Sequence, residues 1–167
     1  MKKYILLVVT LLFIGVGMNQ ANASKSDNGR RIALLVNEYS YMEDFEVVTL
    51  GRLGLGLVKV AIRKSGDEDA MALVHAMKDI KRITIADYGD CSRAVKVEFT
   101  SRLAELLDKD QLLIEAKDSG NLLQIFGVPS DDGSRVTDLI LNAPDEGTLI
   151  CIQGTIPMNK VVEIVNQ

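Results

Sequence analysis

The stretch that decides the fold is Ile80-Lys81-Arg82-Ile83-Thr84-Ile85-Ala86-Asp87-Tyr88. Its polarity alternates. Ile83 and Ile85 point to one side and Arg82 and Thr84 to the other, a pattern that is typical of a strand with one buried face. A helical pattern precedes this stretch and another follows it. We therefore expect a central strand on which both flanking helices pack.

Apolar spacing predicts the helices on either side of this strand. In the helix that follows, the apolar residues recur at helical spacing, and Ser92 or Asp90 is a suitable cap. That stripe consists of Val95, Phe99, Leu103 and Leu106. Other helices are predicted over residues 30–39, 57–63, 67–77 and 158–165.

Runs rich in β-branched residues, separated by turn residues, predict the remaining strands. They cover residues 45–50, 112–117, 122–127, 135–141 and 148–155. The last four follow one another with short turns, so they form an antiparallel meander, and the two earlier strands join the same sheet. The predicted fold class is α+β, an antiparallel meander sheet of about five to six strands with helices packed on one face. The opposite face is expected to be open or to meet a partner, and it carries Arg82, Thr84, Glu115, Lys117 and Gln124.

The first 23 residues have the layout of a bacterial secretory signal peptide. Lys2 and Lys3 precede a mainly apolar run, and Ala21-Asn22-Ala23 is a small-x-small cleavage site. The apolar run of about 15 residues is shorter than the roughly 20 that span a bilayer, and no cysteine follows it to carry a lipid anchor. We expect a signal peptide over 1–23, a flexible polar tail over 24–29 and a single domain over 30–167. The mature protein is then periplasmic or secreted, without a transmembrane segment.

Composition narrows the classes of partner. The full chain carries a net charge of −4, so nucleic acid and anionic lipid are poor partners. Tryptophan is absent and aromatic residues make up only 5%, which argues against a surface that stacks on sugars. Removing residues 1–23 leaves 144 residues, enough for one domain with a sizeable core.

Two cysteines, Cys91 and Cys151, remain after the signal peptide. An exported protein meets an oxidising compartment, so a disulfide between them is one reading, and two separate buried thiols is the other. Their spacing forms no C-x-x-C pair, and no metal site is predicted. No cofactor is expected either, because no cluster of ligating residues occurs.

Other polar features have structural explanations. The run Gly51, Gly54 and Gly56 has the spacing G-x-x-G-x-G, which is not a nucleotide-binding fingerprint, and we interpret it as a weakened helix start. The acids Asp67-Glu68-Asp69 suit the first turn of a helix better than a calcium loop. His75, the only histidine, is tied to no nucleophile by any motif. No catalytic residue is assigned from the sequence.

The order of these pieces resembles a bacterial family of short envelope proteins, the domain of unknown function 4252 family. The likeness covers about residues 30–165 and rests on strands with their flanks, among them residues 45–50, 78–85, 112–118 and 149–156. The glycine run from Gly51 to Gly56 departs from the pattern, since ordinary helix formers are expected there. The resemblance implies an exported domain, and it implies no activity and no catalytic residues.

Two functions from different classes remain open. The first is a non-enzymatic envelope protein that binds another protein, most simply another envelope protein, or a small ligand through its sheet face or an edge strand. The second is a small periplasmic hydrolase whose carboxylates are gathered by the fold, for instance Asp87, Asp90 and Asp131. The second requires two of these carboxyls to line one concave pocket, about 5–9.5 Å apart for glycosidase-type chemistry.

Overall fold

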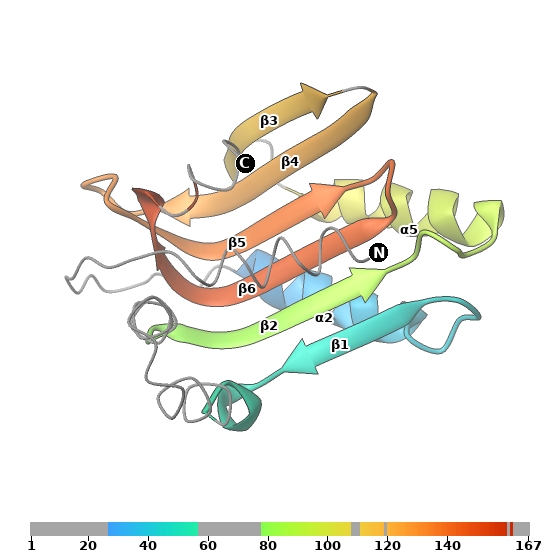
Figure 1. Cartoon of the computed structure of the whole chain (residues 1–167), viewed down its shortest axis with the longest axis horizontal. Helices are drawn as coiled ribbons and strands as arrows, with labels where there is room; N and C mark the ends of the chain where they lie inside the picture. The colour runs from blue at the N-terminus through green and yellow to red at the C-terminus, as the bar shows by residue number, and fades with distance from the viewer. Residues whose placement is uncertain (1–26, 57–77, 108–110, 119, 160, 162–167) are drawn as a thin grey trace, which may run out of the picture.

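A single antiparallel sheet of six strands forms the centre of the computed structural model, in the order β1-β2-β6-β5-β4-β3 (Figure 1). The structure describes residues 27–56, 78–107, 111–118, 120–159 and 161. The elements in chain order are α2 (Asp27–Tyr39), β1 (Glu46–Leu50), β2 (Ile80–Asp87), α5 (Arg93–Leu106), β3 (Leu112–Asp118), β4 (Asn121–Pro129), β5 (Arg135–Ala143) and β6 (Thr148–Pro157).

The predicted fold class is confirmed. Strands β3 to β6 form the antiparallel meander, and β2 then pairs with β6 and β1 with β2. The hairpin between β3 and β4 closes with Asp118 opposite Asn121, and Gly120 takes a φ of 94° there, as a tight turn requires. The stretch from Ile80 is indeed a strand, but it is second from the edge. The prediction that it is the central strand was wrong, because β6, which is buried on both faces over its first half, lies inside it.

Helices α2 and α5 differ little from their predicted bounds. Helix α2 begins at Asp27, so residues 27–29 are helical and do not belong to the polar tail that was predicted to end at Gly29. Ser92 is the cap of α5, accepting a hydrogen bond from the Val95 N–H at 3.4 Å. Residues 52–56, which contain most of the glycine run, are helical as predicted.

Several predictions fall on segments outside the described residues. These are the signal peptide, residues 24–26 of the tail, and the helices predicted over 57–63 and 67–77, with Asp67-Glu68-Asp69 and His75. Residues 158, 159 and 161 are helical and belong to the last predicted helix, whose remainder also lies outside the described part. No helix within the described ranges is long and apolar enough to cross a membrane.

The prediction that the face of Arg82, Thr84 and Gln124 is free of helices was wrong. Thr84 pairs with Cys151, and Cys151 packs in the same cluster as the buried residues of α2 and α5. The face of Arg82, Thr84 and Gln124, expected to be open, is therefore the one beneath the two helices. The reason is that β2 and β6 are apolar on both sides: Ala86, Leu149 and Cys151 are as buried as the isoleucines opposite.

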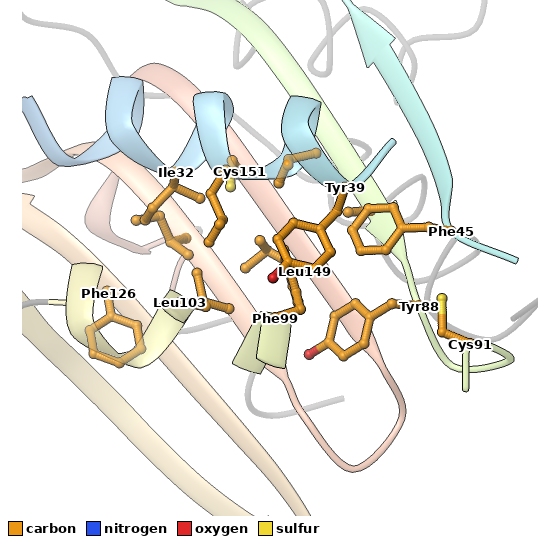
Figure 2. Packing of buried hydrophobic residues seen from close by; sticks show 14 residues of the cluster. Ile32, Tyr39, Phe45, Tyr88, Cys91, Phe99, Leu103, Phe126, Leu149 and Cys151 are labelled. Atoms are coloured by element: carbon orange, nitrogen blue, oxygen red, sulfur yellow. The ribbon is translucent and has the colours of Figure 1, made fainter. Parts of the chain in front are cut away.

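Four aromatic rings join the helices to this face (Figure 2). Phe99 of α5 lies 5.2 Å from Tyr39 of α2, 5.1 Å from Phe45 and 4.8 Å from Tyr88, measured between ring centroids. Phe45 precedes β1 and Tyr88 follows β2, so the four rings come from four separate places in the chain. All are fully or almost fully buried. We call Tyr39, Phe45, Tyr88 and Phe99 the aromatic cluster.

At the surface, α2 and α5 are joined by a second contact. The guanidinium of Arg102 donates two hydrogen bonds to the Glu38 carboxylate, at 2.6 and 2.7 Å, and lies over the Tyr39 ring. The same contact lowers the pKa of Glu38, mainly through the hydrogen bond from Arg102. Because both side chains are exposed, the pair adds little to stability and chiefly fixes how the helices lie together.

The opposite face holds a second cluster, built mainly of aliphatic side chains. Its centre consists of Ile83, Ile150 and Ile152, and Leu139 and Leu141 of β5 extend it. Leu55 and Val161, which lie outside the sheet, also belong to it. Because one cluster lies on each face of the sheet, the middle strands bury apolar side chains on both faces. Their sequences are therefore nearly continuous apolar runs.

Gly154 interrupts β6 where the pairing on both sides becomes irregular. Its φ is 125°, and a Cβ there would lie 2.2 Å from the Asp79 carbonyl oxygen and 2.9 Å from the Ile80 Cα. These neighbours are backbone atoms, so they move aside only if the strands separate. Gly133, in the β4–β5 loop, also has a positive φ, 67°, but a Cβ there would meet nothing within 4 Å.

This pair of glycines separates backbone strain from steric overlap. We expect Gly133→Ala to lower the free energy of unfolding by about 1 kcal/mol, from strain alone. Gly154→Ala adds a clash to that strain and should cost about 3 kcal/mol or more. Urea unfolding followed by circular dichroism measures both. Equal losses would show that β6 and β2 do not approach each other as described.

Candidate functional site

A groove of about 990 Å³ lies between α2 and the sheet. Helix α2 forms one wall, and β1, β2, β5 and β6 contribute the floor and the other wall. The lining is rich in hydroxyl, amide and charged side chains. Those used below are Arg30, Asn37, Thr49, Lys81, Arg82, Thr84, Asp138 and Gln153.

A β-bulge brings two consecutive cations to this groove. Ile80 pairs with Gly154 and Arg82 with Gln153, so β2 has one more residue than β6 at this point and Lys81 has no partner in the register. In a regular strand Lys81 and Arg82 would point to opposite faces. A bulge changes where the side chains point, and here both residues line the groove.

Asp138 on β5 closes the same end of the groove. Its φ of 54° is unusual for a residue other than glycine. Its carboxylate Oδ1 accepts a hydrogen bond from the Gly154 N–H at 3.0 Å. The pairing of β5 with β6 is also irregular between Thr137 and Leu139. Strained residues and bulges persist where the surroundings fix them, and they gather at functional sites.

Neutral polar groups extend along the floor. The Thr49 hydroxyl donates to the Thr84 hydroxyl at 3.4 Å, and Thr84, only 6% exposed, is one of the few buried polar residues among those described. Gln153 donates through Nε2 to the Gly29 carbonyl oxygen at 3.4 Å, which ties α2 to β6. The floor therefore offers hydrogen-bonding groups.

The groove is electropositive in an acidic protein. Within the described residues, the ion pairs are Arg102–Glu38 and Arg135–Asp79, and neither involves Arg30, Lys81 or Arg82. Among the described residues that line the groove, Asp138 is the one carboxylate. Three cations and one carboxylate leave an excess of about two positive charges, and low-dielectric walls strengthen such a field.

Neither cysteine lies in the groove lining. Both are free and buried, and Figure 2 shows them well apart, with Cys151 near Ile32 and Cys91 beyond Tyr88, so the structure does not bring them together. The Cys91 thiol donates to the Glu43 carbonyl oxygen at 3.5 Å. Burial raises the pKa of Cys91, and it raises the pKa of Cys151 to about 12.

Of the three aspartates named for a hydrolase, Asp131 lies far from the other two, and none of them lines the groove. Asp87 pairs with Thr148 at the start of β6, and Asp90 follows it closely in the chain. Asp131 lies in the β4–β5 loop, beside the strand ends that pair with the last residues of β6. The two ends are separated by most of a strand, roughly 25 Å. Over the part of the chain that the structure describes, no group of three or more His, Cys, Asp or Glu residues could hold a metal ion.

Comparison with other proteins leaves the family open. No protein-family model matches the chain. No curated protein and no solved structure matches it significantly. The resemblance to the domain of unknown function 4252 family stays a prediction.

The sequence identified two residues of this site but predicted the wrong surroundings for them. Arg82 and Thr84 were assigned to a binding face, but to one expected to be free of helices. Lys81 and Arg30 were missed, because a bulge and the placement of α2 arise from tertiary pairing. One signal was present: Gly154 inside an apolar strand is typical of a bulge or of a close backbone approach.

The cysteines give a direct check on this packing. We expect the denatured protein, residues 24–167, to contain two reactive thiols and the native protein to contain none that reacts quickly. Burial removes access, and a raised pKa leaves little thiolate at pH 8. Counting thiols with Ellman's reagent with and without guanidinium measures this. No thiol in the denatured, unreduced sample would mean a disulfide and would contradict the structure.

Proposed function

We propose that the protein is a non-enzymatic, exported binding module that holds a ligand or a segment of another envelope protein in the groove between α2 and the sheet. The observation that carries this proposal is the groove itself. Its volume is within the range of small-molecule sites, about 300–1,000 Å³. Its lining combines a bulge, an aspartate with a positive φ and three cations that form no ion pair with another described residue.

Other features support binding. Arg30, Lys81 and Arg82 are exposed and form no ion pair among the described residues, so their charge is available to an anionic ligand. The groove is also built on regular elements, α2 and four strands, which hold side chains more firmly than loops do. Export, inferred from the first 23 residues, would place the module in the bacterial envelope.

A photo-crosslinker placed in the groove tests the proposal in cells. Asn37 is exposed on α2 and lines the groove, and Glu105 is exposed on α5 and does not. We expect a photoreactive residue at position 37, in full-length protein exported by the host, to give a reproducible adduct in mass spectrometry. The same residue at 105 serves as the matched control. Equal labelling at both positions, or none at 37, would contradict a binding role for the groove.

A further inference from the structure

The charges of the groove define a ligand class. We propose that it binds a small dianion, a molecule carrying two negative charges as carboxylates or as a phosphate group, at the end formed by Lys81, Arg82 and Arg30. This inference rests on the proposed binding function and goes beyond it by naming the ligand's charge.

The charges of the side chains that line the groove favour a ligand with two negative charges. Arg30, Lys81 and Arg82 are exposed within the groove, and Asp138 offsets one of them. The Asp138 carboxylate is already engaged by the Gly154 N–H. A ligand with one negative charge would leave one of these cations without a partner. A ligand with three negative charges would carry more charge than the excess positive charge of the groove. A ligand with two negative charges balances that excess.

The bulge in β2 places two of the three cations next to each other in the groove lining. It adds one residue to β2, and that residue is a lysine next to an arginine. Both residues therefore line the groove from one short segment, and Arg30 lines it from the first turn of α2. Arginine pairs with carboxylate or phosphate through two parallel hydrogen bonds, and lysine adds a point charge.

Neutral polar groups line the groove together with the cations. The Thr84 hydroxyl is buried and faces the groove together with Thr49, and Gln153 lies between Arg82 and α2. These groups fix the orientation of a small polar molecule. An extended polymer such as nucleic acid fits the acidic chain as a whole poorly.

Calorimetric titration of the protein, residues 24–167, tests the proposal with defined probes. At pH 8, where both are mainly doubly charged, succinate and inorganic phosphate are the dianions, and succinamide is the neutral analogue of succinate. We expect saturable binding of at least one dianion, weakened by added salt, and none of succinamide. Binding of phosphate alone, of succinate alone or of both supports the proposal and identifies the anionic group.

Charge-neutral variants locate the site. Lys81→Gln and Arg82→Gln should each weaken binding about tenfold or more, since a hydrogen bond to a charged group is lost. Arg93→Gln and Lys117→Gln remove the same charges from exposed positions outside the groove and should change affinity less than twofold. Thermal unfolding of each variant confirms that it folds.

Three results would overturn the inference. They are no dianion binding at millimolar concentration, equal binding of succinate and succinamide, and equal losses in groove and control variants. If the photo-crosslink at position 37 is nevertheless specific, the groove is a binding site for a ligand of different charge. If both experiments fail, the proposed function fails with this inference.

Discussion

The contacts between Phe99 and the other rings of the aromatic cluster are the constraint on which the rest of the structure depends. The rings of Tyr39, Phe45 and Tyr88 surround Phe99 within about 5 Å between centroids. Such ring pairs stabilise by about 0.5–1.5 kcal/mol beyond the burial of their area. Because the four rings come from α2, α5 and the ends of β1 and β2, they fix both helices over one face of the sheet.

The groove is a consequence of that placement. Helix α2 buries Ile32, Leu35, Val36 and Tyr39 against the sheet and α5, so its neighbouring side, with Arg30 and Asn37, overhangs β1 and β2. The irregular pairing around Gly154 then supplies the remaining cations. The packing of one side of α2 therefore positions the polar residues on its neighbouring side in the groove. Stability and ligand binding both depend on this helix.

Particular residues show how much of the fold and of the groove could be predicted from the sequence. The alternation at Ile83 and Ile85 identified a strand correctly, and Ser92 identified a helix start, because both signals are local. The prediction that the face of Arg82 and Thr84 is free of helices failed because Ala86, Leu149 and Cys151 make both sides of β2 and β6 apolar. Local alternation does not show which of two apolar faces the helices cover. The groove could not be predicted from the sequence for a similar reason. Lys81 faces it only through pairing between strands distant in sequence.

A double-mutant cycle on Tyr39 and Phe99 tests the central claim most directly. The unfolding free energy is measured for the unsubstituted protein, Tyr39→Leu, Phe99→Leu and the double variant. The account predicts that both single variants are destabilised and that the two losses are coupled by about 0.5–1.5 kcal/mol, since either change removes the same ring contact. Losses that add within about 0.3 kcal/mol would contradict it, because α2 and α5 would then not be held together by these rings.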